Sequence, residues 1–483
     1  MASVNRQSLR EEFEALKGRF AQLGAAGKVG AESGALIEAL LMLLQLLMAI
    51  FLEKTTPKTS ANSSKPSSQT EKDETALGRA GPHTQGRAYD ETRSANTRTV
   101  EYTHISPVGF CETCGEDLRA VHPHGHERRT QIDIVFEKVL THVDAEIKSC
   151  PHCESETRGA FPEAFAGPVQ YGAGIKAYVL NLVIAQMVSL QRARHAIQSL
   201  IGLMISEATI LKYVWQLHQA LARWEQSAIA QLLTLPTLHV DETSLRVDRR
   251  NHWIHVCSGG DITLKFVHEK RGLDAMTAIG IIPKYGGVIV HDCWASYLSY
   301  DHCRHGLCGA HLLRELTFIH EANGYAWARN MKRLLQQTCF RVSRRKRKRL
   351  TPCEYDALQQ HYRNILTRGA RELPPIPAKQ NGKRGRVAKS DAHNLWERLK
   401  AHESAVLLFA QDANVPFTNN RAERDLRMSK VKQKVSGCFR KAEYAEAYCR
   451  ISSYLQTMAY QGVNPLIAIQ MALSGELYRK PGE

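Results

Sequence analysis

Three acidic residues occupy positions where neighbouring elements could bring their carboxylates together. Asp241 follows the apolar run TLHV, Asp292 follows GGVIVH, and Glu423 lies far downstream in VPFTNNRAERDLR. If the two runs form adjacent strands, the aspartates meet at one edge of a sheet, where like charges are costly unless a cation offsets them. Mg²⁺ or Mn²⁺ held by a few carboxylates suits such a site. Two ions roughly 4 Å apart can activate a water or a 3′-hydroxyl, so these acids predict metal-dependent phosphodiester chemistry.

A structural role for the same acids is also open. Each aspartate could be a turn residue at the end of a strand. Asn420 is a good helix N-cap, Glu423 stands where it could reach back to the cap, and Arg427 could pair with Glu423 one turn further on. The pattern of this segment alone does not decide between capping and metal binding.

The cysteines indicate a second kind of metal site. Two CxxC pairs have the spacing of a tetrahedral zinc site, with a redox dithiol as the alternative: Cys111, Cys114, Cys150 and Cys153. The first twenty residues are too charged for a secretory signal, which predicts a reducing cytoplasm and favours metal over disulfides. Cys308 and His311 form a CxxH pair whose expected role is packing or local hydrogen bonding.

The charge balance indicates a polyanionic partner. The 483 residues include 64 lysines and arginines against 48 aspartates and glutamates, which gives a net charge of +16 and a pI near 9.3. Nucleic acid is the commonest partner of such a chain, and an anionic membrane surface is the alternative. The uncharged run 39–52 is shorter than the roughly twenty apolar residues that a membrane span needs, so no span is expected.

Short β-branched runs separated by turns begin at residue 237. TLHVDETSLRV, HWIHVCSGG and ITLKFVHEK predict three strands, followed by a helical stretch, a fourth strand in GGVIVHDCW and a candidate fifth in HGLCGAH. This order predicts an α/β core in which Asp241 and Asp292 belong to the first and fourth strands.

A helical region, residues 166–234, precedes the strands. Its apolar residues recur every three or four positions, and Gly202 with Ser206 marks a tight turn between two helices. Two helices joined in this way are typical of a helix-turn-helix unit, which would read DNA through Lys212 and Gln216. An ordinary helical hairpin fits the pattern equally well.

Composition divides the remainder of the chain. Residues 1–53 carry a leucine-rich seam predicted to self-associate or to dock on the protein's own core: Leu36, Leu40, Leu43, Leu47 and Ile50. The other predicted segments are a polar linker (54–99), the cysteine module (100–165), a catalytic core (235–320 and 411–450), a helical basic insertion (321–410) and a helical tail (451–483). The insertion contains a basic run expected to contact phosphates, with Arg344, Arg345, Lys346 and Arg347.

Four segments together resemble the insertion-sequence-66 family of bacterial DDE transposases: TLHVDETSLRV, VIVHDCWASY, LCGAHLLREL and VPFTNNRAERDLRMSKVKQKVSGCFR. The resemblance implies a ribonuclease-H-like mixed sheet flanked by helices, with Asp241, Asp292 and Glu423 as the metal-binding triad. It also implies that the cysteine module is a DNA-binding zinc finger. The basic residues around and after Glu423 would then face DNA phosphates: Arg421, Arg424, Arg427, Lys430, Lys432, Lys434 and Arg440.

The expected function is therefore DNA transposition. The chain would bind the terminal repeats of its element, cut to expose 3′-hydroxyls and join them to target DNA. It would act as a homo-oligomer in the bacterial cytoplasm, at the nucleoid, with accessory proteins of the same element as further candidate partners. The alternatives are a non-catalytic DNA-binding repressor or domesticated transposase, and a nuclease that cleaves without joining.

Overall fold

The computed structural model describes residues 6–63, 102–131, 137–165, 167–376 and 389–476. The described parts of Met1–Arg79 and Arg223–Thr457 form one compact unit, called here the sheet unit. Those of Ala80–Ala222 and Met458–Glu483 form a second, called here the helical unit.

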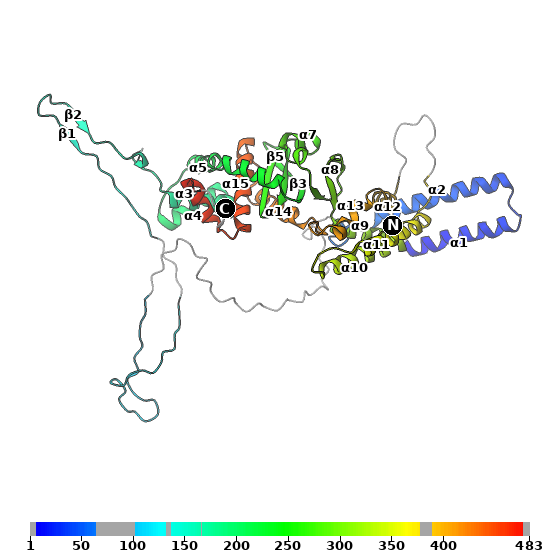
Figure 1. Ribbon diagram of the computed structural model, residues 1–483, viewed down its shortest axis with the longest axis horizontal. Coiled ribbons are helices and arrows are strands. Elements are labelled where there is room, and N and C mark those ends of the chain that lie inside the picture. Colours follow the sequence, from blue (N-terminus) through cyan, green and yellow to red (C-terminus); the bar gives the residue numbers. More distant parts are fainter. Residues whose placement is uncertain (1–5, 64–101, 132–136, 166, 377–388, 477–483) are drawn as a thin grey trace, which may run out of the picture. The chain divides into compact units, whose positions relative to one another are not determined.

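A mixed sheet of five strands, in the order β5-β4-β3-β6-β7, is the framework of the described sheet unit (Figure 1). The strands are β3 (Thr237–Val247), β4 (Arg250–Gly259), β5 (Ile262–His268), β6 (Val288–His291) and β7 (Arg304–Leu307). β3, β4 and β5 pair antiparallel, whereas β6 and β7 run parallel to β3. The fifth strand predicted from HGLCGAH is confirmed, and the order is compatible with a ribonuclease-H-like core.

Different helices cover the two faces of this sheet. Leu238 and Val240 of β3 pack in one core with α6 (Ala222–Leu233), α7 (Leu273–Ile279) and the 3₁₀ turn η5 (Ile282–Lys284). His239 and Asp241 alternate with them and point to the opposite face. α14 (Asn420–Ser436) packs on that face, and α15 (Ala442–Tyr460) joins it there, where Ser453 accepts a hydrogen bond from the backbone of β5 at 2.8 Å.

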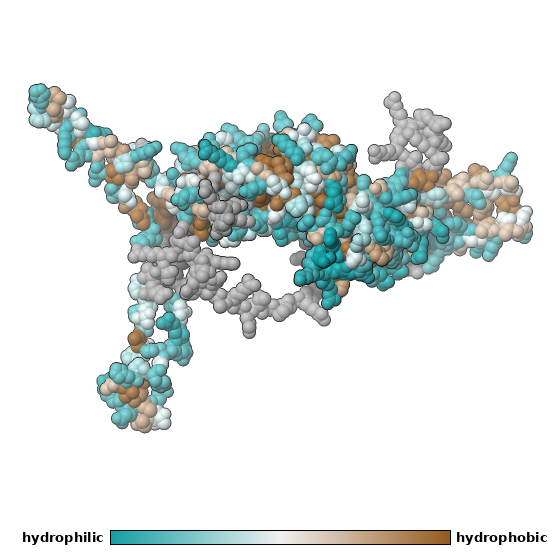
Figure 2. Space-filling view, viewed as in Figure 1, coloured by the Kyte–Doolittle hydropathy of each residue, from teal (hydrophilic) through white to brown (hydrophobic). Residues whose placement is uncertain are grey.

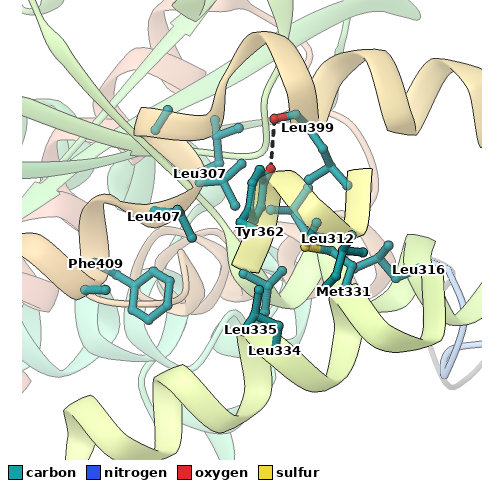
Figure 3. Packing of buried hydrophobic residues seen from close by; sticks show 14 of the residues in the cluster. Leu307, Leu312, Leu316, Met331, Leu334, Leu335, Tyr362, Leu399, Leu407 and Phe409 are labelled. Atoms are coloured by element: carbon teal, nitrogen blue, oxygen red, sulfur yellow. Dashed lines mark hydrogen bonds between the residues drawn. The ribbon is translucent and has the colours of Figure 1, made fainter. Parts of the chain in front are cut away.

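The helices between β7 and α14 share a hydrophobic core with the sheet. They are α9 (Gly309–Asn323), α10 (Ala326–Ser343), α11 (Pro352–Glu372), α12 (Asp391–Ala401) and α13 (Glu403–Gln411). Figure 3 shows Leu307 of β7 beside Leu407 and Tyr362 in this core, and the hydroxyl of Tyr362 donates to the carbonyl of Leu399 at 2.8 Å. These helices therefore cover the part of the sheet formed by β6 and β7.

The N-terminal helices α1 (Arg6–Ala25) and α2 (Ala31–Thr55) form a hairpin that docks through the end of α2. Glu53, which is 4% exposed, accepts hydrogen bonds from Asn323 and from the backbone of Asp391 and Ala392 at the start of α12. Asn62 donates to Glu321 of α9 at 2.7 Å. Residues 56–63, which composition assigned to the linker, are therefore packed on the sheet unit.

Much of α2 remains exposed along the hairpin (Figure 2). Its exposed apolar residues include Leu36, Leu40, Leu43, Leu44, Leu47 and Phe51. Among the described helices, α2 is long and apolar enough to cross a membrane by length and composition. Its C-terminal end is fixed to α9 and α12 by buried Glu53, while 17% of its most apolar window is buried.

The helical unit contains α3 (Ala173–Leu180), a π turn η4 (Asn181–Ala185), α4 (Leu190–Ile201), α5 (Glu207–Ala220) and α16 (Pro465–Ser474). Gly202 ends α4 with a positive φ of 68°, and Ser206 caps α5 by accepting from the backbone N–H of Thr209 at 3.0 Å. α16 packs against α3 and α5, so this part of the predicted tail belongs to the helical unit. The cysteine module contains β1 (Ile147–Ser149), antiparallel to β2 (Glu156–Arg158), and the 3₁₀ turn η3 (Glu163–Phe165).

Candidate active site

Asp241, within β3, lies beside Asp292, which directly follows the parallel strand β6. His239 of β3 is paired with Val290 of β6, and the same offset carried two residues further places Asp241 opposite Asp292. Adjacent strands are roughly 5 Å apart, so the two carboxylates lie close together beside the C-terminal end of β6. Cys293 follows with a φ of 75°, a conformation that few non-glycine residues adopt and that is often found at functional sites.

Asn419 fixes the start of α14 on β3. Its side-chain Nδ2 donates to the carbonyl of Val240 at 2.9 Å, and its Oδ1 lies 2.9 Å from Nδ1 of His239. Its backbone N–H points at the sulfur of Cys308 at 3.1 Å. Because the helix begins at the next residue, Glu423 in its first turn is held beside the two aspartates.

The N-cap of α14 is Asn419 rather than the predicted Asn420. Neither residue makes a side-chain cap bond, because the amide of Asn419 is turned towards β3. The capping interpretation of Glu423 is therefore wrong. One carboxylate oxygen of Glu423 lies 3.5 Å from Nδ1 of His311 instead.

Two distant segments interlock next to the acids. A Cβ at Gly309 would lie 2.2 Å from the ring of Phe417, and one at Gly306 would lie 3.0 Å from Val415, so only glycine leaves room for these side chains. Four contacts join the two segments: Gly306 with Val415, Gly309 with Phe417, Cys308 with Asn419, and His311 with Glu423. Together they bring Glu423 to the sheet from more than a hundred residues away.

Electrostatics shows that the acids act on one another. Burial raises the pKa of Asp241 to about 7, with further contributions from the charges of Glu242, Asp292 and Glu423. A carboxylate with this pKa is only about half ionised at neutral pH, and a nearby cation would offset both the burial and the repulsion. The arrangement therefore favours a bound cation.

The IS66 transposase family matches residues 168–447, more than half of the chain and the part that contains all three acids. This chain belongs to that family. No curated protein matches it. Membership makes the protein a transposase, in a family whose members bind DNA and generally use divalent metals.

Sequence reasoning missed a buried cluster beside the first aspartate of the transposase. Glu242 accepts two hydrogen bonds from Arg271, at 2.6 and 2.8 Å, and one from the hydroxyl of Tyr297 in α8 (Ala295–Leu298) at 2.5 Å. The guanidinium of Arg271 lies over the rings of Trp253 and Trp294. The available signal was a second acid inside a β-branched strand, where a charge needs a partner.

Five of the seven basic residues expected to face DNA around α14 are exposed: Arg424, Arg427, Lys430, Lys434 and Arg440. Arg421 instead forms an ion pair at 3.0 Å with Asp425, which is fully buried. Lys432 is 8% exposed, and burial lowers its pKa to about 8. The expectation that these two residues present their charges to DNA is thus corrected, because the face of α14 that carries them packs on the sheet.

The other predicted DNA contacts lie on two further elements of the transposase. Arg344, Lys346 and Arg347 are exposed in the turn after α10, whereas Arg345 is paired with Glu354 of α11. In the helical unit, α5 exposes two side chains one turn apart, Lys212 and Gln216. Recognition of DNA by any of these residues stays a prediction.

Each CxxC pair of the transposase forms the same tight turn. The backbone N–H of Cys111 donates to Glu116, and that of Cys150 donates to Ser155, both at 2.9 Å. Backbone N–H groups, that of Cys114 foremost, lower the pKa of Cys111 to about 7 and so favour a thiolate. Among the described residues the two pairs do not approach closely enough to share a metal, so the zinc site stays a prediction.

Proposed function

We propose that this transposase cuts DNA at the ends of its own element and joins the resulting 3′-hydroxyls to target DNA. The observation that carries the proposal is the meeting of Asp241, Asp292 and Glu423 from β3, the end of β6 and the first turn of α14. A protein that only bound DNA would have no need to keep like charges together at a cost in stability.

The donor set fits a hard divalent cation. Asp241, Asp292 and Glu423 offer only carboxylate oxygens, the ligands that Mg²⁺ and Mn²⁺ prefer. Bound there, such ions would activate the attacking water or 3′-hydroxyl and stabilise the leaving oxygen. Within the protein, Asn419 and the register of β3 with β6 hold the three acids in place.

The exposed basic side chains of α14 would bind the phosphate backbone of the DNA. Arg424, Arg427, Lys430 and Lys434 extend from the first turn of the helix, where Glu423 lies, towards its C-terminal end. A strand that follows this row would bring a phosphodiester to the acids. The exposed turn at 344–347 would add contacts that do not depend on sequence.

The helix pair α4–α5 is proposed to recognise the element ends. Replacing Lys212 and Gln216 with alanine should weaken binding to end DNA more than binding to random DNA. The matched change, Arg344→Ala with Arg347→Ala, should weaken both equally and reduce the salt dependence of binding. Equal losses from the α5 double variant, measured by fluorescence anisotropy, would assign α4–α5 to packing.

Cleavage and joining of end-containing DNA in Mg²⁺ test the proposed function. Glu423→Gln should abolish both steps while end binding is retained, and Glu443→Gln, an exposed acid on α15, should leave both intact. Cleavage without joined products would favour the nuclease alternative. A wild-type protein that binds ends, and neither cleaves nor joins, would favour the repressor or domesticated transposase.

Other proposed properties follow from the same function. The enzyme would act in the bacterial cytoplasm at the nucleoid and as a homo-oligomer, because two element ends must be processed together. The exposed leucines of α2 are the candidate contact. A zinc ion bound by the four cysteines would hold together the cysteine module of the helical unit, and accessory proteins of the element are further candidate partners.

A further inference from the structure

A thiol, an imidazole and a carboxylate meet where α9 approaches α14. One candidate ligand atom from each of Cys308, His311 and Glu423 lies within 4.8 Å of the other two. Cys308 and His311 are three residues apart at the start of α9 and therefore lie on the same side of the chain. Glu423 is delivered by a different helix, so the grouping is a product of the tertiary fold.

Two of these atoms are buried without a hydrogen bond. Nδ1 of His311 and Oε1 of Glu423 are inaccessible to solvent and make no hydrogen bond within the described part of the chain. A polar atom left in this state costs roughly 1–3 kcal/mol, and such atoms in native proteins often mark an ion or a water. A cation between the two would satisfy both atoms at once.

The spacing suits a tetrahedral metal. Zinc bonds of about 2.0–2.2 Å to nitrogen and oxygen, at tetrahedral angles, separate those two ligand atoms by about 3.4 Å. The observed separation of the His311 and Glu423 atoms is 3.5 Å. The sulfur of Cys308 is within reach of the same centre and accepts the backbone N–H of Asn419 at 3.1 Å.

We propose that Cys308, His311 and Glu423 form a binding site for a transition-metal ion of the Zn²⁺ class. Thiolate and imidazole select such ions over Mg²⁺, whose preferred ligands are oxygens. Three protein ligands leave a fourth position for water. An ion held there takes the Glu423 carboxylate away from Asp241 and Asp292. That consequence rests on the proposed function, whereas the binding itself does not.

Titration of the full-length protein with Co²⁺, without DNA, tests the site. Tetrahedral Co²⁺ bound to a thiolate shows a charge-transfer band and strong visible bands, and the cysteine module can contribute its own. The informative quantity is therefore the difference between variants. Wild type should bind one more equivalent than Cys308→Ser and His311→Gln, while Cys353→Ser, which removes an exposed thiol elsewhere in the sheet unit, should match wild type.

In Cys308→Ser and His311→Gln the affinity for that Co²⁺ equivalent should fall by at least about 100-fold. Replacing a residue that only hydrogen-bonds to a metal ligand already lowers metal affinity by about 10- to 100-fold. Cys114→Ser, in the cysteine module, should retain this equivalent. Glu423→Gln keeps the buried thiol and should lower the affinity as well, which preserves the test if Cys308→Ser fails to fold by circular dichroism. Equal stoichiometry and affinity in wild type, His311→Gln and Glu423→Gln would overturn the proposal. A failure of DNA cleavage would not affect this result, because no DNA is present.

Discussion

The side-chain amide of Asn419 donates to the carbonyl oxygen of Val240, one residue before Asp241, at 2.9 Å. This bond joins the helix that carries the third acid to the strand that carries the first. The position of Glu423 in the candidate active site therefore depends on a residue that is not itself an acid.

Asn419→Ala should lower strand-transfer activity by more than its loss of folding stability can explain. The change leaves the Val240 carbonyl without its partner, which costs about 1–3 kcal/mol in the free energy of unfolding. A shift of α14 by about 1 Å could reduce strand transfer by roughly 100-fold. Asn420→Ala, at the exposed neighbouring position, should change neither quantity. Thermal unfolding and a joining assay measure the two effects, and equal behaviour of the two variants would deny Asn419 this role.

Substitutions of Arg421 and Arg424 should have different effects, the first on folding stability and the second on DNA binding. Arg421→Ala removes the charged partner of fully buried Asp425, and breaking a buried pair costs about 3–5 kcal/mol. Arg424→Ala, on the exposed side of the same helix, should leave the melting temperature unchanged and weaken DNA binding, with a salt slope smaller by about one. Denaturant unfolding and anisotropy titrations at several salt concentrations distinguish the two. A loss of DNA affinity in a fully stable Arg421→Ala protein would contradict this division.

The stability of the metal-free protein should depend on pH through Asp241. Its pKa in the folded protein is about 7, against an ordinary value of 3.8. Between these values the folded state holds a proton that the unfolded state has lost. The free energy of unfolding therefore falls by about 1.4 kcal/mol per pH unit as pH rises through this range, and the dependence ends above about pH 7.

Urea unfolding with a chelator, in wild type and Asp241→Asn, isolates this contribution. The difference in unfolding free energy between the two proteins should show this pH dependence, because the contributions of all other titrating groups cancel. Mg²⁺ must displace the same proton, so its affinity should rise with pH up to about 7. A difference that does not vary with pH would show that Asp241 is ionised in the metal-free protein.

The leucines of α2 should control association. Leu40, Leu43 and Leu47 are 52%, 45% and 64% exposed, so three lysines there leave the docked end of the helix intact. The triple variant should be monomeric by light scattering at concentrations where wild type is an oligomer. Leu46→Lys, at a buried position, should lower stability instead. An unchanged mass of the triple variant would place the contact elsewhere.

The strands and the first two acids could be predicted because their signals are local. β-branched runs identify β3 and β6, and the parallel register then brings Asp241 opposite Asp292. No local pattern connects Glu423 to them. That link depends on Phe417 packing over Gly309, a contact between segments far apart in the sequence. The chemistry of a metal site and the family resemblance both suggested Glu423 as the third acid, but neither revealed this contact.

The two faces of α14 could not be assigned from hydrophobic periodicity. Its buried residues recur at helical spacing, but most of them are polar: Ala422, Asp425, Leu426, Ser429 and Lys432. A buried stripe of this kind is invisible to a pattern that counts apolar residues. The sequence therefore predicted a single basic surface. In the structure some of these basic residues are buried and the others face solvent.

Packing of the last described helix, α16, against α3 and α5 has a consequence for protein synthesis. Ribosomes make α3 to α5 early, yet the apolar surfaces of α3 and α5 stay uncovered until residues 465–474 have been added. Chains cut short before that point would lack this cover over α3 and α5 and would expose apolar surface that cellular proteases recognise. Incomplete copies would then be removed instead of occupying element ends in competition with the intact enzyme.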